Sequence, residues 1–357
     1  MNDFRFQALP WNIVSGIDSI QRLPGELESM NLRRALVLCT PAQHAEGQRV
    51  VDLLGDKAVG IYDKAAMHVP METVEEALQL QAQLSADCSV AIGGGSTTGL
   101  GKALALKGGL KNIVIPTSYA GSEMTNVWGI TQDGRKTTGR DSRVVPDLTI
   151  YDPRLTLTMP PLFAASSGLN AIAQAAVNIA TDNASPMVEA LAMEAVRRLA
   201  HALPIVLEDP ENLEARADAQ IGACMAGSAL GTGTTGLHHR LCHTFGGSFN
   251  TPHAETHTVL LPYSVAYNSR AVPAGTAKLA QALGCSDAAD GLQQLAKQLG
   301  APSSLAQLNI RRDDLDEAAR ITLANPLQNP EPVSVERVML LLDCAYEGAP
   351  PSQLKLT

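Results

Sequence analysis

The chain has 357 residues and a formal net charge of −9, with 45% hydrophobic and 18% charged residues. This length predicts two domains of roughly 150 residues each, and the balance of apolar and charged residues excludes an intrinsically disordered chain. The negative charge argues against a nucleic-acid-binding surface, which needs clustered Lys and Arg. We therefore expect a globular protein that acts on a small molecule. An anionic substrate would require a local basic pocket.

The six cysteines are scattered along the chain and form no C-x-x-C pair. In a chain of this length they are typical of reduced thiols in a cytosolic protein rather than of a disulfide framework. The N-terminal residues MNDFRFQALPW lack the apolar run of a signal peptide. We see no stretch that approaches the ~18 apolar residues of a membrane span. These features predict a cytoplasmic protein without a membrane partner.

The N-terminal part of the chain alternates short apolar, β-branched runs with helical patterns. We expect strands at residues 35–38, 59–62, 89–92, 112–115 and 144–151, and helices at residues 72–84 and 99–106. This β-α-β-α alternation predicts a parallel sheet with helices on both faces.

The pattern changes after Pro160, where strand signals nearly vanish and Ala- and Leu-rich segments recur with a helical period. We expect helices at residues 164–180, 186–203, 213–230 and 237–246. The sequence therefore predicts an α/β domain over residues 1–155 and an all-helical domain over residues 156–357.

The first candidate site follows the expected strand at residues 89–92. It contains three glycines and three hydroxyl residues: Gly93, Gly94, Gly95, Ser96, Thr97 and Thr98. Glycines let the backbone approach a bulky ligand, and we expect the hydroxyls to cap the following helix, whose N-terminus favours phosphate. The spacing differs from the G-x-G-x-x-G fingerprint. A tight strand-to-helix turn is the alternative, but the triple glycine favours a phosphate-binding loop.

The second candidate site is the segment PTSYAGSEMT at residues 116–125, which follows the next expected strand. In open α/β sheets, ligands bind at the carboxyl ends of the strands, so both segments should lie at the same sheet edge. The hydroxyls of this loop suit ribose and nicotinamide contacts. The alternative is a polar surface loop.

The third candidate site is the densest, because five of the eight histidines lie between residues 238 and 257. His239 and His243 are four residues apart and share one helix face. We expect the glycines at 246–247 to end that helix and a loop to bring His253 back, so that three imidazoles converge. Such a group binds a metal ion or donates protons near neutral pH.

These segments together resemble the iron-containing alcohol dehydrogenase superfamily, and most closely its maleylacetate reductase branch. The resemblance covers nearly the whole chain and is carried by ADCSVAIGGGSTTGLGKALAL, IPTSYAGSEMTNVWGIT, LHHRLCHTFGG and PHAETHTVLLP. It implies a Rossmann-like dinucleotide-binding domain, an all-helical catalytic domain of the dehydroquinate synthase-like fold, and an active site in the cleft between them. It also implies NADH or NADPH as hydride donor. Members of the branch reduce maleylacetate to 3-oxoadipate in the breakdown of aromatic compounds.

The resemblance assigns roles to individual positions. The cofactor would lie on the glycine loop and on Thr117, Ser118, Tyr119, Ser122 and Lys136. His243 would lie beside the nicotinamide, with His239 and His253 as the other catalytic histidines. No acidic residue follows the strand at 35–38, so the choice between NADH and NADPH stays open. Helical domains of this kind often pair in the family, which implies a homodimer.

The metal-dependent members of the superfamily bind iron through an aspartate, a histidine four residues later and two histidines of the C-terminal cluster. The matching positions here are Asn170, Gln174, His239 and His253. Asparagine is usual for the maleylacetate reductase branch, but histidine would be expected at Gln174 and glutamate at Val177. Because two neutral amides are poor partners for a tightly held divalent ion, we expect no catalytic metal.

Without a metal, imidazoles would stabilise the developing enolate oxygen and donate a proton. Asn170, Gln174 and Arg240 would contact the substrate. The alternative for Arg240 is a side chain that faces solvent. The departures at Gln174 and Val177 support an alternative: a diverged member recruited to biosynthetic tailoring or non-redox acid–base chemistry. A third hypothesis is a non-catalytic protein that binds a dinucleotide. It predicts loss of the histidine cluster between residues 238 and 257.

Overall fold

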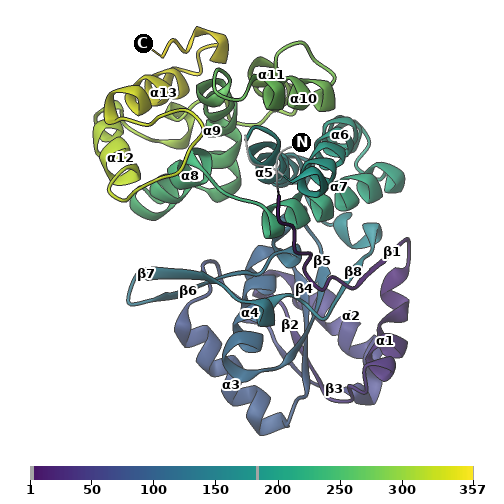
Figure 1. Ribbon diagram of the computed structural model, residues 1–357. Coiled ribbons are helices and arrows are strands. Elements are labelled where there is room, and N and C mark those ends of the chain that lie inside the picture. The colour runs from purple at the N-terminus through teal and green to yellow at the C-terminus, as the bar shows by residue number, and fades with distance from the viewer. Residues whose placement is uncertain (1–3, 182–184, 357) are drawn as a thin grey trace. The chain divides into compact units, whose positions relative to one another are not determined.

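The computed structural model describes residues 4–181 and 185–356. The chain forms two compact units. The sheet unit comprises Ala8–Met159 together with Glu211–Gly227, and the helical unit comprises the described residues of Met1–Gln7, Pro160–Pro210 and Ser228–Thr357. In Figure 1 the sheet lies in the purple-to-teal part of the chain, and the helical unit is coloured from teal to yellow.

The main sheet is parallel, with strand order β1-β8-β5-β4-β2-β3 (Figure 1). Its strands are β1 (Ile13–Ser15), β2 (Ala35–Leu38), β3 (Ala58–Tyr62), β4 (Cys88–Gly93), β5 (Lys111–Pro116) and β8 (Leu148–Tyr151). The strands expected at residues 35–38, 59–62, 89–92 and 112–115 are confirmed. The strand expected at residues 144–151 begins only at Leu148, because a 3-10 turn ends at Val144 and Pro146 follows it. Proline removes the N–H that the sheet requires.

Helices cover both faces of this sheet, as the alternating pattern predicted. They are α1 (Leu23–Ser29), α2 (His44–Leu54), α3 (Met71–Leu84) and α4 (Gly95–Gly108). In β2, Ala35 and Val37 pack into one core cluster with α1 and α2, whereas Leu36 and Leu38 pack into another with α3 and α4. This two-residue alternation places apolar side chains on both faces of the strand.

An antiparallel hairpin leaves the main sheet after β5. It consists of β6 (Val127–Gln132) and β7 (Arg135–Arg140). The turn residues Asp133 and Gly134 have φ values of +50° and +72°, and Asp-Gly is the preferred pair for a two-residue hairpin turn with positive φ at both positions. The sequence analysis did not predict this hairpin, although the Asp-Gly pair signals it.

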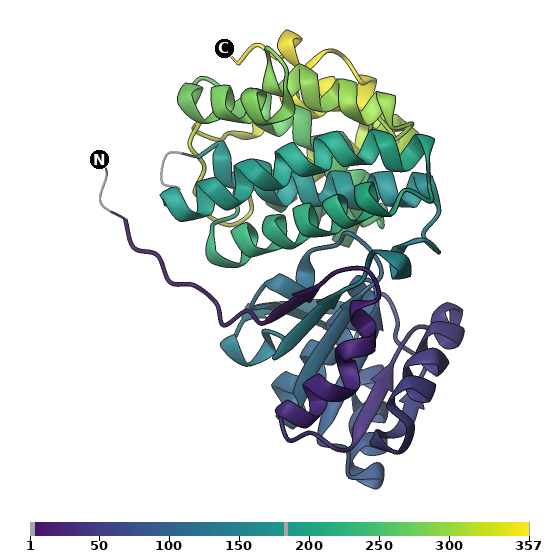
Figure 2. The ribbon, with the colours of Figure 1, turned by 90° about the vertical axis from the view of Figure 1, so that its right-hand side faces the viewer.

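Helices make up the chain beyond β8, and no strand occurs there among the described residues. The helices are α5 (Pro161–Ile179), α6 (Pro186–Glu208), α7 (Leu213–Thr232), α8 (Leu237–Ser248), α9 (His253–Asn268), α10 (Pro273–Leu283), α11 (Ala288–Gln298), α12 (Leu315–Thr322) and α13 (Val335–Glu347). Figure 2 shows the helices of the helical unit stacked side by side. The first part of α7 groups with the sheet unit.

Two expectations about the helices are corrected. Helix α8 continues through the glycines at 246–247 to Ser248, because neither glycine adopts the positive φ that ends a helix. Helix α5 is long and apolar enough to cross a membrane by length and composition, contrary to the sequence analysis. However, 83% of its apolar window is buried inside the protein. It is therefore a core helix of the helical unit.

Candidate active site

The glycine loop lies where β4 passes into α4. Gly93 ends β4 with a φ of +150°, and a Cβ at this position would lie 2.5 Å from Thr97 Oγ1. Both constraints favour glycine. Helix α4 begins at Gly95, and its N-cap is Gly94, which offers no side-chain cap. The prediction that residues 96–98 cap the helix was wrong, because they already lie in its first turn.

The second loop, residues 116–125, lies directly beside the glycine loop, residues 93–98, because β4 and β5 are neighbours in the sheet. The Thr117 N–H donates to Gly93 O at 3.0 Å. Gln43 Nε2 donates to Thr117 Oγ1 at 2.8 Å. This bond joins the segment before α2 to the second loop. A Cβ on Gly94 would lie 3.2 Å from Ser118 Oγ. The two loops therefore form one surface at the carboxyl edge of the sheet.

A buried lysine of α4 fixes the far end of the second loop. Lys102 is 2% exposed, and its Nζ donates to the carbonyls of Ser122, Thr125 and Val127 at 2.5, 2.8 and 2.9 Å. It also contacts Thr125 Oγ1 at 3.0 Å. Burial lowers the pKa of Lys102 to about 7, and the charge of Glu123 opposes this shift. Four oxygen acceptors around one nitrogen favour the ammonium form, and we take the charged form as the one that holds the loop.

These two loops fit a nicotinamide dinucleotide. Thr97 Oγ1 and Ser122 Oγ are buried and have no hydrogen-bond partner among the described residues. Buried hydroxyls of this kind are normally satisfied, so both are ready to bond a ligand. Thr97 lies in the first turn of α4, where the free backbone N–H groups attract phosphate. The second loop also contributes three buried residues, Thr117, Ser118 and Tyr119.

Lys136 lies on β7 rather than in either loop. It pairs with Thr131 across the hairpin, and a Cβ on Gly129 would lie 3.0 Å from its Cε. Its side chain is exposed, and its charge acts on His68. A role beside the ribose stays a prediction.

The five histidines of α8 and α9 lie close together in the helical unit. His238, His239 and His257 are buried, whereas His243 and His253 are exposed. The ring centroid of His257 lies 4.8 Å from that of His238, 5.3 Å from that of His239 and 4.6 Å from that of His253. The charge of His243 also acts on His238 and His257. The three predicted histidines are thus joined by two that the sequence analysis gave no role.

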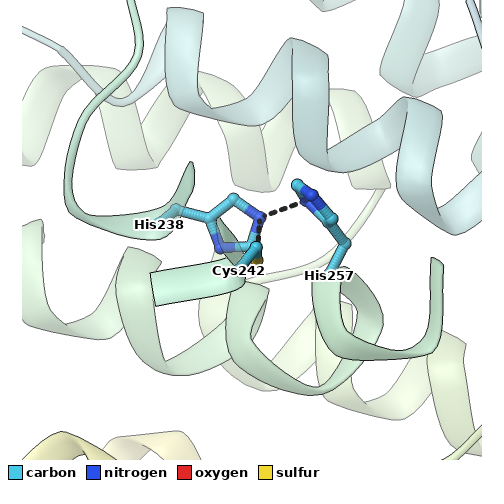
Figure 3. Close-up of side chains that lie close together, drawn as sticks. All are labelled: His238, Cys242 and His257. Atoms are coloured by element: carbon cyan, nitrogen blue, oxygen red, sulfur yellow. Dashed lines mark hydrogen bonds between the residues drawn. The ribbon is translucent and has the colours of Figure 1, made fainter. Parts of the chain in front are cut away.

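The inner part of this cluster consists of His238, Cys242 and His257 (Figure 3). His238 Nε2 lies 2.9 Å from His257 Nδ1 and 3.7 Å from Cys242 Sγ. Burial lowers the pKa of His238 to about 3, lowers the pKa of His257 well below its usual value and raises the pKa of Cys242. Two nitrogens at hydrogen-bond distance share a proton, so they do not both offer a lone pair to one cation.

The two amides expected at the site lie on the buried side of α5, which packs against α9. Asn170 and Gln174 are 5% and 7% exposed, and Asn170 Oδ1 is buried with no hydrogen-bond partner among the described residues. Asn178, one turn further, donates to Gln174 O at 3.0 Å and accepts from Thr234 N at 2.9 Å. Asn178 therefore ties this face of α5 to the loop that leads into the histidine helix α8.

Val177 faces a cavity of about 310 Å³ in the helical unit. His238 and Ser264 belong to the same wall, together with hydroxyl and amide side chains that include Thr234 and Asn329. The described residues that line the cavity include no Asp, Glu, Lys or Arg. A glutamate at position 177 would therefore introduce a charge into a neutral polar cavity.

Arg240 is directed toward another part of the helical unit. Its Nη2 lies 3.4 Å from the carbonyl of Pro326. Because it follows His239 directly on α8, its side chain leaves the helix about 100° away from that histidine. Substrate contact by Arg240 stays a prediction.

Several residues of the two sites were missed by sequence reasoning. They are Gln43, Lys102, Asn178, His238, His257 and Ser264. The histidines were visible in the dense segment, but spacing does not show which imidazoles are buried. Lys102 stands in the apolar run GLGKALAL, where one cation among core residues is a signal of a buried, fully bonded lysine.

The comparisons with known proteins cover both units. Residues 10–153 match the model of the iron-containing alcohol dehydrogenase family, and residues 164–346 match that of its C-terminal domain. The chain belongs to this family. It is 47% identical to the maleylacetate reductase of Sphingobium indicum over 348 residues, which cover 98% of this chain and 99% of that protein.

Further relatives agree. The maleylacetate reductase of Burkholderia cepacia is 48% identical over 352 residues, with coverage of 99% of this chain and 100% of that protein. The crystal structure of maleylacetate reductase from Agrobacterium tumefaciens matches with a TM-score of 0.96 and 44% identity, and covers 98% of this chain and 100% of that chain. The protein is therefore an oxidoreductase of the maleylacetate reductase branch, with the predicted fold, and the family supports a nicotinamide cofactor.

Proposed function

We propose that this protein reduces the carbon–carbon double bond of maleylacetate to give 3-oxoadipate, with NADH or NADPH as hydride donor and without a catalytic metal. The observation that carries the proposal is the cluster of five histidines on α8 and α9, packed beside the amide face of α5. The full-length similarity to maleylacetate reductases supports the choice of substrate. The same similarity does not favour a non-redox member recruited elsewhere.

The sheet unit supplies the cofactor surface. The glycine loop and the first turn of α4 would hold the pyrophosphate, and the hydroxyls of Thr97 and Ser122 would bond the bound dinucleotide. When bound, the reduced nicotinamide supplies a hydride to the double bond. Lys102 acts indirectly, because it orients the backbone of the second loop.

The helical unit supplies the proton and the stabilising charges. Maleylacetate is a dianion whose double bond is conjugated to a carbonyl, so negative charge develops on that oxygen during reduction. N–H groups of the exposed His243 and His253 would donate to the oxygen, and one of them would deliver the proton that completes the addition. His239 and the amides of Asn170 and Gln174 would fix the substrate. One hydride and one proton then add across the bond.

The donor set at the family's iron positions does not fit a tightly held divalent ion. Asn170 and Gln174 offer neutral amide oxygens where a carboxylate and an imidazole bind iron in the metal-dependent members. His239 and His253 would be the only strong ligands of the four. We therefore propose that stabilisation of the enolate comes from hydrogen bonds alone. Action in the cytoplasm stays a prediction from the cysteine pattern and the N-terminal residues, and pairing as a homodimer stays a prediction from the resemblance.

The proposal is tested with purified protein, maleylacetate and each reduced dinucleotide in turn. We expect oxidation of NADH or NADPH, followed by absorbance, with formation of an equal amount of 3-oxoadipate, identified by mass spectrometry. Binding of the dinucleotide without turnover of maleylacetate would contradict the substrate assignment. Failure to bind either dinucleotide would contradict the redox function itself.

A further inference from the structure

The inner histidines of the cluster belong to a chain of hydrogen bonds that runs along α8 and α9. His257 Nδ1 lies 2.9 Å from His238 Nε2, and His238 Nδ1 lies 3.3 Å from Ser264 Oγ. Ser264 Oγ in turn lies 2.9 Å from the carbonyl of Leu260. Figure 3 shows the two imidazoles facing each other along the first of these bonds. Both rings are 2% exposed.

The last bond of the chain fixes the direction of the others. The Leu260 carbonyl can only accept, so the hydroxyl of Ser264 donates its single proton to that carbonyl. Ser264 Oγ therefore accepts the hydrogen bond from His238 Nδ1–H. His238 therefore has a bare Nε2. The bond to His257 must then be donated by His257 Nδ1–H, because His238 Nε2 carries no proton. Cys242 S–H, at 3.7 Å, contacts the same acceptor nitrogen.

This order leaves a bare nitrogen at the far side of His257. A neutral imidazole carries one proton, and in His257 that proton is on Nδ1. Burial of both rings disfavours the charged imidazolium form. His257 Nε2 is buried and has no hydrogen-bond partner among the described residues. A buried acceptor without a donor is uncommon in native proteins and calls for a partner.

We propose that His257 is a positioning residue whose Nε2 accepts a hydrogen bond from the imidazole of His253 in the reacting complex. His238 and Ser264 hold the tautomer that makes Nε2 an acceptor. The rings of His253 and His257 meet edge to face, with centroids 4.6 Å apart. With both ring nitrogens protonated, the exposed His253 donates one N–H inward to His257 and directs its other N–H toward the substrate, where it can donate. The inference rests on the proposed function of His253 in maleylacetate reduction.

Two isosteric substitutions separate this role from a packing role. His257→Gln places an amide oxygen near the position of Nε2 and loses the donor to His238. His257→Asn keeps an N–H near the position of Nδ1 and has no atom at Nε2. We expect kcat for maleylacetate to fall about 100-fold in His257→Asn, the upper range for loss of an orienting partner of an active-site histidine. His257→Gln should retain most of the activity, and both variants should bind NADH like the wild type.

A second pair tests the origin of the tautomer. Ser264→Ala removes the acceptor of His238, whereas Thr258→Ala removes a hydroxyl that makes the same kind of bond, to Ala254 O at 2.9 Å. Both hydroxyl residues are 3% exposed on α9. We expect kcat to fall only in Ser264→Ala and to recover in Ser264→Thr. Equal loss in the two alanine variants, or higher activity in His257→Asn than in His257→Gln, would overturn the proposal.

The tautomer itself is observable without turnover. Nitrogen NMR of protein labelled with ¹⁵N-histidine distinguishes a protonated from a bare ring nitrogen, and the spectrum of His257→Gln assigns the signals. We expect His257 to be protonated on Nδ1 and bare on Nε2 in the wild type. A proton on Nε2 would refute the arrangement whatever the substrate is. Absence of maleylacetate turnover by the wild type would instead refute the proposed function.

Discussion

Replacing Lys102 by methionine should loosen the second cofactor loop, because one ammonium group holds three of its backbone carbonyls. Methionine fills similar space but donates no hydrogen bond. The carbonyls of Thr125 and Val127 would then lose this buried donor, at a cost of about 1–3 kcal/mol for each unsatisfied group. The Ser122 carbonyl would keep the backbone N–H and the hydroxyl of Thr125 as donors. Removing a buried charge recovers part of this cost. We therefore expect a net loss of about 3 kcal/mol in the free energy of unfolding, within the range of about 2–6 kcal/mol for two unsatisfied carbonyls.

The effect is measured in the sheet unit by tryptophan fluorescence, because both tryptophans, Trp11 and Trp128, belong to that unit. Trp11 Nε1 also donates to Met124 O, within the loop, at 2.8 Å. A loss of about 3 kcal/mol corresponds to a fall in Tm of about 6–12 °C for a unit of this size. NADH should bind about tenfold more weakly, equivalent to about 1.4 kcal/mol.

Lys107→Met is the matched control, because Lys107 is an exposed residue of the same helix. It should change neither the Tm nor the affinity for NADH. If Lys102→Met melts within about 2 °C of the wild type, a shift of less than about 1 kcal/mol, and binds NADH normally, the ammonium does not hold the loop. The reasoning from its four contacts would then be wrong.

Three further predictions concern the helical unit. His243→Ala should lower kcat for maleylacetate by about 10²–10⁴-fold, the usual range for loss of a general acid, and an unchanged kcat at saturating substrate would exclude that role. The double variant N170D/Q174H restores the family's iron-binding residue types and should retain a divalent metal on elemental analysis, whereas the wild type should not; equal metal content in both proteins would contradict the donor-set argument. The pKa of His238 is lowered from 6.5 to about 3 in the folded protein. Between these two pH values the unfolded chain therefore binds a proton at His238 and the folded chain does not. Stability should therefore be full above pH 6.5 and decline as the pH falls toward 3, as measured by urea midpoints, and midpoints that stay constant between pH 7.5 and pH 5 would count against a buried neutral pair.

The sequence predicted the parts of the fold that depend on local patterns. The strands β2, β4 and β5 are mainly apolar and, apart from the first residue of β5, buried, and such runs between helical segments are typical of a parallel sheet. The edge strand β1 escaped prediction because only three residues pair and its side chains are largely exposed. The helix caps and the end of α8 were misplaced by one turn or less, which reflects how weakly single residues fix helix ends.

The candidate site was predicted less completely, because its chemistry depends on contacts between distant segments. The triple glycine and the histidine-rich segment were singled out as a phosphate-binding loop and a catalytic cluster, and these roles stay predictions. The sequence did not show that Lys102 binds carbonyls 20 to 25 residues away. Nor did it show that His238 and His257 are bonded to each other. Which histidines are buried, and where each proton lies, follows only from the packing of α8 on α9.

The central claim is a metal-independent, NAD(P)H-dependent reduction of maleylacetate. The most direct test follows dinucleotide oxidation by purified protein in the presence of maleylacetate, before and after dialysis against a strong chelator, with the metal content determined in parallel. The account predicts rapid turnover that is the same before and after dialysis, in protein with less than stoichiometric metal. Turnover that is lost with the chelator and restored by iron or zinc would contradict it.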